Sequence, residues 1–196
     1  MIQETPQADL FKQQMRESLR QGPLNSRAVT IAKHDHVYTC GDNDEMVYFI
    51  ESGQIKLLML SPGGKECLLA IHAAGDIFGE LCLSGLGARL ETAIAMEETV
   101  IKQISCSNFF ERLGRDALFE GFVQYLAARI ADQQQVIANL VTVDSEQRLG
   151  KTLLQLARKL GKKDPRSIRI EPKITHEELS EMVGATRLRI SMFMQR

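Results

Sequence analysis

Short apolar runs separated by turn residues dominate the first half of the chain and most restrict its fold. Between positions 28 and 105, the runs MVYFIES, QIKLLML and ECLLAIH are rich in β-branched and large apolar residues. They are bounded by the turn-prone stretches CGDND, SGQ, SPGGK and AAGD. Pro62-Gly63-Gly64 suits a tight hairpin, because glycine adopts the positive φ angles that such turns need. Strands at this spacing predict a sandwich, jelly roll or barrel, and periodicity does not choose among them.

The pattern becomes helical near Ser107. From Asn108 to Val143 the chain has no proline, and no glycine after Gly121. A spacing of 3, 4, 3, 4 and 3 residues defines a seam formed by Val123, Leu126, Ile130, Gln133, Ile137 and Leu140. Such a seam is typical of a helix that packs against an equivalent helix, so it favours a homodimer. An amphipathic helix packed on its own domain is the alternative.

A second helix is predicted from Gln147 to Leu160, with four leucines on one face and Gly161 and Pro165 at its end. The run SIRIE alternates like a short strand. Lys159, Lys162 and Lys163 form a basic cluster that we interpret as a solvated face, with phosphate contact as the alternative.

The last 22 residues indicate two short helices around a glycine turn. Thr175 and Glu178 form a capping box, Gly184 ends the first helix, and Thr186 is suited to cap the next. This is helix-turn-helix character, in which the second helix enters the DNA major groove. An arginine of this helix can donate two hydrogen bonds to one guanine. The alternative is a plain helical hairpin that does not bind DNA. The candidate DNA contacts are Thr175, Thr186, Arg187, Arg189, Ser191 and Arg196.

Charge is distributed unevenly along the 196 residues, although the net charge is only -1. From Arg148 onward there are 12 Lys and Arg against 5 Asp and Glu, which indicates a basic terminus on an acidic body. The composition is that of a soluble protein, and no apolar run or signal peptide indicates a membrane, so we expect a cytoplasmic location.

The cysteines are far apart in sequence and form no CxxC pair, which argues against a zinc site. We expect reduced and mostly buried thiols, with a redox sensor or an iron–sulfur site as the alternative. They are Cys40, Cys67, Cys82 and Cys106.

Three features occur in one order along the chain: the stretch GDIFGEL, the long seam helix with NLVTVDSEQRLGKTLLQLA, and the terminal helix-turn-helix. This order resembles the CRP/FNR family of bacterial transcription regulators, over roughly residues 29–196. The resemblance implies an α+β fold. An N-terminal helix and an effector-sensing jelly roll of the cyclic-nucleotide-binding type would span 1–107, a dimerisation helix 108–143, and a winged-helix domain 144–196. Asp144 would be the hinge. Because family members continue into a wing, we expect this domain to be incomplete at Arg196.

The resemblance also implies an effector site, and the sequence departs from it. Glu80 would hold a ribose hydroxyl, the backbone at Gly79 and Leu81 would cradle a cyclic phosphate, and Thr92 would supply a hydroxyl. Glu91 replaces the arginine that precedes this threonine in cyclic-AMP binders. An anion beside a phosphate turns an attraction into a repulsion. A cyclic nucleotide is therefore a possible effector, but we expect cyclic-AMP binding to be lost or weak.

Two other cations could replace the missing arginine. Arg89 would share a strand face with Glu91, and we favour a surface pair of these two residues over an inward-turned Arg89. Arg129 lies one helical turn before Gln133 and Gln134, which match the polar residues that contact the base in cyclic-AMP binders.

The DNA reader departs from the family as well. Leu188 replaces a glutamate and Met192 replaces an arginine, so the preferred DNA site should differ from that of the family's cyclic-AMP binders.

These features predict a homodimeric regulator, not an enzyme, whose partners are double-stranded DNA, a second copy of the chain and RNA polymerase. An effector in the roll would move the recognition helices through the dimer helix. The alternative is a regulator without a small-molecule effector, whose roll is closed by its own side chains. A cupin-type enzyme using His34, His36 and His72 as metal ligands is a remote third possibility, and we assign no catalytic residue or metal ligand.

Overall fold

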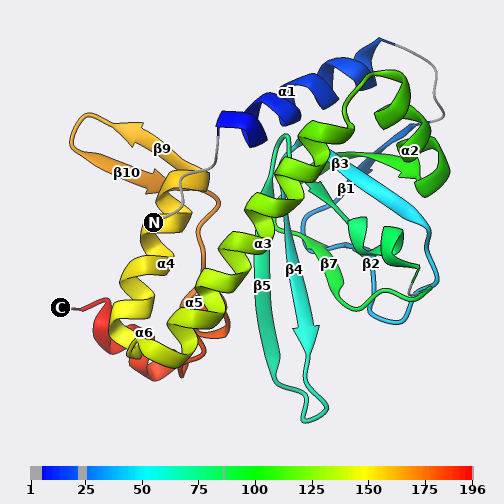
Figure 1. Ribbon diagram of the computed structural model, residues 1–196. Helices are drawn as coiled ribbons and strands as arrows, with labels where there is room; N and C mark the ends of the chain where they lie inside the picture. Colours follow the sequence, from blue (N-terminus) through cyan, green and yellow to red (C-terminus); the bar gives the residue numbers. More distant parts are fainter. Residues whose placement is uncertain (1–5, 22–25, 86, 196) are drawn as a thin grey trace.

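The computed structural model describes residues 6–21, 26–85 and 87–195. Two four-stranded sheets, with strand orders β1-β8-β3-β6 and β2-β7-β4-β5, form a roll (Figure 1). Side chains from both sheets, including Tyr48, Ile55 and Phe78, fill its interior. The strands are β1 Arg27–Ile31, β2 His36–Tyr38, β3 Met46–Ser52, β4 Gln54–Leu60, β5 Glu66–Ala73, β6 Ile77–Phe78, β7 Thr92–Ala95 and β8 Thr99–Ser105.

The three apolar runs that predicted strands form β3, β4 and most of β5. The predicted hairpin joins β4 to β5, with Ser61 N donating to Lys65 O at 2.9 Å and Gly64 at φ +75°. Between β6 and β7, the short 3-10 helix η1 (Glu80–Ser84) carries the first part of the expected effector site.

The segment 108–143, expected to be one helix, contains parts of two. Helix α2 spans Cys106–Arg115 and α3 spans Phe119–Thr142. Ala117 lies between them with φ +53°, and the turn places both Leu113 and Leu118 in the core. The periodic pattern did not reveal this break, because residues on both sides favour helix.

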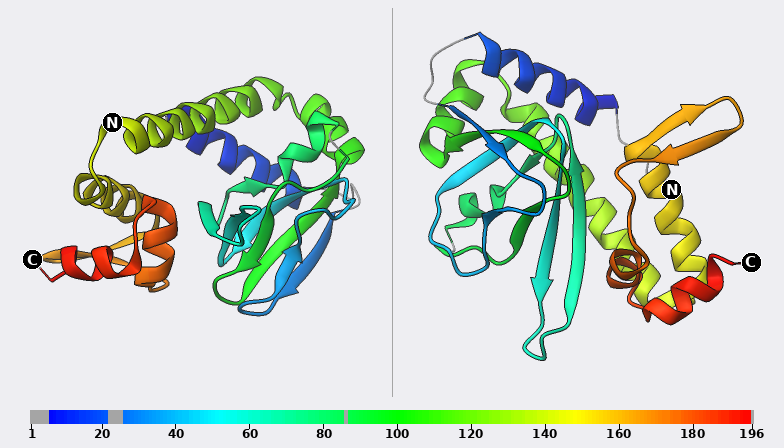
Figure 2. Two further views of the ribbon diagram at one scale, coloured as in Figure 1. Left: turned by 90° about the horizontal axis from the view of Figure 1, so that it is seen from below. Right: turned by 180° about the vertical axis from the view of Figure 1, so that it is seen from behind.

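Helix α1 (Pro6–Arg20) lies along α3 on one side of the roll (Figure 2). Phe11 and Met15 of α1 are fully buried against Phe49 of β3 and Phe122 of α3. This packing fixes α3 relative to the roll.

The C-terminal module, residues 145–195, consists of α4 Ser145–Leu160, β9 Gly161–Asp164, β10 Ser167–Ile170, α5 His176–Val183 and α6 Arg187–Phe193. Leu149, Leu156 and Leu160 of α4 are buried, as the leucine spacing predicts. They belong to one apolar cluster with Leu58 of β4 and Ile71 of β5. The C-terminal module therefore packs directly on the roll.

Polar contacts reinforce this packing. Lys56 Nζ of β4 lies 2.8 Å from Glu178 Oε1 of α5, and Gln54 Nε2 donates to Glu171 O at 2.6 Å.

None of the described helices is long and apolar enough to cross a membrane.

Candidate effector and DNA-binding sites

Arg89 is buried, with only 4% of its surface exposed. It lies among Tyr38, Asp44 and Gly79, and we call this group the mouth of the roll. The Arg89 guanidinium donates to Gly79 O at 2.6 Å and to Met46 O, and Nη2 lies 3.0 Å from Asp44 Oδ2. The same group lies 4.3 Å from the centroid of the Tyr38 ring. A buried arginine is stable only with such compensation, and here the chain itself supplies the acceptors and the counter-charge.

Glu91 is also buried, with 2% exposed, so the expected surface pair with Arg89 is wrong. The Tyr38 hydroxyl donates to Glu91 Oε1 at 2.8 Å. Burial, together with the Glu91 carboxylate, raises the pKa of Tyr38 and keeps this hydroxyl a donor. Glu91 Oε2 has no hydrogen-bond partner among the described residues. The substitution thus places an anion inside the roll.

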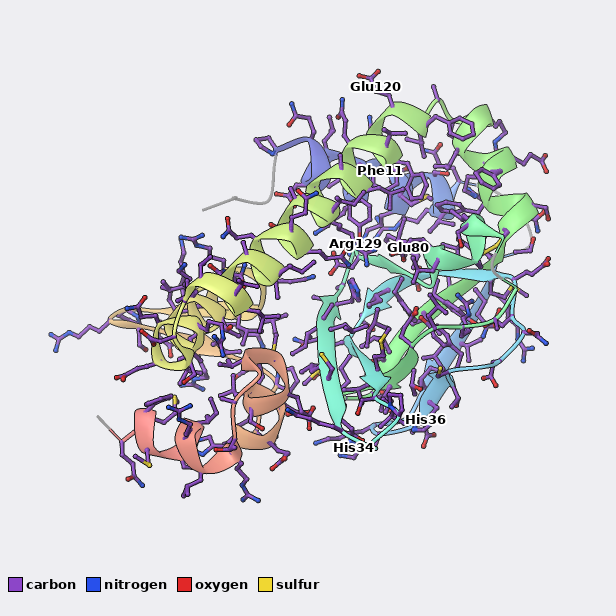
Figure 3. The ribbon with its side chains drawn as sticks, turned by 60° about the horizontal axis from the view of Figure 1, so that its bottom comes forward. Phe11, His34, His36, Glu80, Glu120 and Arg129 are labelled. Carbon is purple, nitrogen blue, oxygen red and sulfur yellow. A yellow bond between two sulfur atoms is a disulfide. The ribbon has the colours of Figure 1, made fainter. Side chains whose placement is uncertain are left out.

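Glu80 and Arg129 pair with each other. Arg129 Nη1 of α3 lies 2.8 Å from Glu80 Oε1 and also donates to Ile77 O at 3.1 Å (Figure 3). The pair ties η1 to the helix that carries the seam. Each of these two candidate effector contacts is therefore already engaged by the other.

The remaining effector candidates divide into two groups. Gly79 has φ +76°, and a Cβ there would lie 2.8 Å from the Tyr48 ring and 2.9 Å from Arg89 Nη1, so Gly79 belongs to the packed mouth of the roll. Thr92 Oγ1 accepts a hydrogen bond from Cys40 N at 3.0 Å. In contrast, the side chains of Leu81, Gln133 and Gln134 are exposed.

A small recess lies beside Arg89. It is bordered by Asp44, Cys82 and Arg89 and has a cavity volume of about 70 Å³. Small-molecule sites usually measure about 300–1,000 Å³, so this recess does not hold a nucleotide without rearrangement of its side chains.

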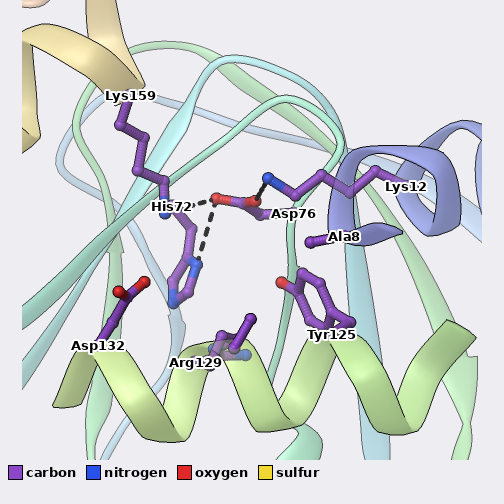
Figure 4. Close-up of a pocket in the computed structure, with 9 residues that line it drawn as sticks. Ala8, Lys12, His72, Asp76, Tyr125, Arg129, Asp132 and Lys159 are labelled. Carbon is purple, nitrogen blue, oxygen red and sulfur yellow. Dashed lines mark ion pairs between the residues drawn. The ribbon is translucent and has the colours of Figure 1, made fainter. Parts of the chain in front are cut away.

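A buried carboxylate that the sequence did not single out joins three parts of the fold. Asp76, in the turn between β5 and β6, lies 2.9 Å from Lys12 Nζ of α1 and 2.8 Å from Lys159 Nζ of α4 (Figure 4). His72 Nδ1 of β5 is 3.4 Å from the same carboxylate. We call these four residues the Asp76 cluster. It lines a cavity of about 60 Å³ beside Tyr125 and Arg129.

The electrostatics of the Asp76 cluster follow from burial and charge. Burial by itself raises the pKa of Asp76, but Lys159, His72 and Lys12 outweigh it and hold that pKa well below the usual value. Burial lowers the pKa of His72 to about 4, so His72 is neutral at pH 7. From the sequence, AAGD predicts only a turn at Asp76. Lys159, assigned to a solvated basic face, instead reaches into the cluster.

Cys82 of η1 and Cys106 of α2 form a disulfide, and Cys40 and Cys67 are free and exposed. The expectation of four reduced, mostly buried thiols is therefore wrong. The bond links the segment that carries Glu80 to the start of α2.

Helices α5 and α6 form the predicted helix-turn-helix. Thr175 and Glu178 form the capping box, and Thr186 Oγ1 accepts from Arg189 N at 3.3 Å, so both threonines serve as helix caps. Arg187 and Arg189 are exposed. Arg187 Nε lies 3.9 Å from Glu177 Oε2, and Ser191 Oγ lies 2.9 Å from His176 Nδ1. Arg196 lies outside the described residues.

Helix α3 carries an exposed apolar stripe that differs in part from the predicted seam. Leu126 packs against the core and does not belong to the stripe. Gln133 is exposed, as are the stripe residues Val123, Ile130, Ile137, Leu140 and Val141. After α3, Asp144 caps α4 by accepting from Glu146 N and Gln147 N at 3.0 and 2.9 Å.

The structure separates the three histidines that a cupin-type metal site would use. His34 and His36 are exposed near the start of β2, away from Glu80 and Arg129 (Figure 3), whereas His72 is buried on β5. Within the described ranges, no group of three or more His, Cys, Asp or Glu side chains is placed to hold a metal ion.

Residues 28–116 match the family model of the cyclic nucleotide-binding domain. The chain is 31% identical over 154 residues to the CRP-like cAMP-activated global transcriptional regulator of Mycobacterium tuberculosis, covering 77% of this chain and 68% of the relative. The protein belongs to the CRP/FNR family of transcription regulators, as predicted.

Solved structures agree with this fold. The c-di-GMP responsive global regulator CLP of Xanthomonas campestris superposes with a TM-score of 0.76 at 19% identity, covering 92% of this chain and 90% of that one. A CRP/FNR-family transcriptional regulator of Thermus thermophilus gives a TM-score of 0.69 at 21% identity, covering 86% and 84%.

Proposed function

We propose that this protein is a homodimeric, sequence-specific DNA-binding transcription regulator that acts in the cytoplasm. The observation that carries the proposal is α6, the second helix of a helix-turn-helix, which presents Arg187 and Arg189 to solvent in a chain of this family. In this proposal residues 1–107 sense, 108–143 dimerise and 144–196 bind DNA. RNA polymerase is the proposed protein partner, because a promoter-bound regulator acts through polymerase.

The apolar stripe on α3 supports the homodimer. Its residues are exposed, and Val123, Ile130 and Ile137 repeat every seven positions, so a second copy can cover them by helix packing. A dimer would present two copies of α6, which is what a two-fold symmetric DNA site requires.

The charges at the mouth of the roll support the proposal that cyclic AMP is not the effector. Arg89 already pairs with Asp44 and Arg129 with Glu80, and Glu91 adds a third carboxylate, so an entering phosphate would meet an excess of negative charge among the described residues. An effector in the roll would have to displace Arg89 from Gly79 O and separate Glu80 from Arg129. The packing of Arg89 therefore favours the alternative regulator, which has no small-molecule effector.

If an effector does bind, its action would be a population shift. By breaking the Glu80–Arg129 pair it would release α3 from η1 and change how the C-terminal module, hinged at Asp144, sits on the roll. Only a ligand with unequal affinity for the two arrangements could do this.

DNA binding is tested by selecting sites from random duplexes and measuring affinity by fluorescence anisotropy. Arg187→Ala should weaken specific binding by about 1–3 kcal/mol, the usual contribution of one bidentate base contact. Arg20→Ala, an exposed arginine on α1, is the matched control and should have no effect. An equal loss on random DNA would mean that Arg187 contacts only phosphate.

Calorimetric titration tests the effector proposal separately. Cyclic AMP should give no tight, saturable binding to the wild-type chain. The same titration with the Arg89→Met variant tests whether this side chain excludes the ligand, because the substitution removes the guanidinium group from the mouth of the roll.

A further inference from the structure

Helix α6 exposes two large apolar side chains beside its arginines. Leu188 is 72% exposed and Met192 is 50% exposed. They are four residues apart, so they lie one above the other on the same helix face. The opposite face is anchored by Ile190, which is fully buried, and by the partly buried Phe193.

The direction of this face is fixed by the rest of the helix-turn-helix. The contact of 2.9 Å between Ser191 Oγ and His176 Nδ1 joins α6 to α5. Thr186 caps the first turn of α6. Leu188 and Met192 therefore project outward from a helix whose orientation is held, and Arg187 is exposed in its first turn.

We propose that Leu188 and Met192 read thymine in the DNA major groove through its C5-methyl group. This inference rests on the proposed DNA-binding function and specifies what the helix recognises. Neither side chain carries a hydrogen-bond donor, and neither can match the polar edges of guanine, adenine or cytosine. The thymine methyl is the apolar group that the major groove offers, and apolar side chains contact it.

Charge supports DNA as the occupant of this face. Arg187 and Arg189 flank Leu188 in sequence, and the segment from Arg148 onward carries 12 Lys and Arg against 5 Asp and Glu. Such an excess of positive charge suits a phosphate backbone. The ion pair that Arg187 makes with Glu177 is long, at 3.9 Å, and both side chains are mostly exposed, so DNA can readily replace it. The preferred half-site should therefore combine a guanine read by Arg187 with neighbouring thymines.

The test removes single methyl groups from the DNA. A site selected from random duplexes with the wild-type chain is resynthesised with deoxyuridine in place of each thymine, one at a time. Since deoxyuridine differs from thymidine only by the methyl group, wild-type affinity should fall about three- to fivefold at the contacted positions, as expected for one buried methyl.

Two variants identify the residues that cause the loss of affinity on deoxyuridine DNA. In Leu188→Ala the loss caused by deoxyuridine should disappear at one position, and in Met192→Ala at a different one. Leu154→Ala, an exposed leucine of α4, is the matched control and should keep the full sensitivity. Because both target side chains are at least half exposed, melting curves should confirm that the variants stay folded.

The outcomes separate this inference from the proposed function. Specific binding with no sensitivity to any thymine methyl overturns the inference and leaves DNA binding intact. Unchanged sensitivity in both alanine variants also overturns it, because a different group would then contact the methyl. If no sequence is enriched and Arg187→Ala has no effect, the DNA-binding proposal itself fails.

Discussion

Replacing Asp76 by Asn removes the negative charge at the centre of the Asp76 cluster and changes the side-chain size little. The ammonium groups of Lys12 and Lys159, 2.9 and 2.8 Å from the carboxylate, would then lose the counter-charge that they share. Removing one partner of a buried ion pair usually costs about 3–5 kcal/mol. The lysine side chains are 16% and 30% exposed and can turn toward water, so we expect the lower end, about 3 kcal/mol.

For a chain of this size, about 3 kcal/mol corresponds to a fall in Tm of about 6–12 °C. Thermal and urea unfolding at pH 7 measure it. The matched control is Asp9→Asn, because Asp9 lies 4.0 Å from the same Lys12 but is 54% exposed, and its loss should cost less than about 1 kcal/mol. A double-mutant cycle with Lys159→Met isolates the contact between the roll and the C-terminal module.

The pH dependence provides a second check. The pKa of Asp76 is depressed in the folded protein, so its contribution is complete above the pKa of an unfolded Asp, about 3.9, and is lost as pH falls through the folded pKa. The deficit of the Asn variant should thus be full at pH 7 and shrink below about pH 4. An Asp76→Asn protein as stable at pH 7 as the Asp9→Asn control would refute this reasoning.

Three further predictions concern other parts of the fold. The lowered pKa of His72, about 4, means that stability should fall as pH drops from about 6.5 toward 4, and His72→Gln should flatten the stability–pH curve in this range if the histidine is its cause. Ile137→Asp places a charge on the exposed stripe of α3 and should shift sedimentation from dimer to monomer while the helical circular dichroism persists; an unchanged dimer would mean that another surface mediates it. Gly79→Ala should lower the free energy of unfolding by about 1–3 kcal/mol, because of its φ of +76° and the contact with Tyr48, whereas Gly63→Ala, whose new Cβ would lie 4.0 Å from Ser61 Oγ, should have a much smaller effect.

Local patterns predicted those elements whose cause is local. The strands at 46–52 and 54–60 and the hairpin between β4 and β5 follow from alternation and glycine placement. The capping box of Thr175 follows from residues three positions apart. The family follows from the order of these elements along the chain.

The direction of a charged side chain could not be predicted in this way. Arg89 turns inward because β-sheet pairing brings Asp44, the carbonyl groups of Met46 and Gly79, and the Tyr38 ring to one place. The Asp76 cluster depends on contacts between α1, the roll and α4, so the partners of Asp76 are far from it in sequence. Local sequence patterns do not predict such long-range contacts.

The apolar cluster shared by the roll and the C-terminal module makes these two parts one cooperative unit. Leu58, Leu68 and Ile71 on β4 and β5 are covered by Leu149, Leu156 and other apolar residues of the module. Swinging the module away would bring this surface into contact with water, at a cost of roughly 25 cal/mol for each Å² of apolar area. A second stable orientation of the module therefore requires another apolar surface to cover these strands. The number of stable orientations of the helix-turn-helix is limited by the number of surfaces that can do so.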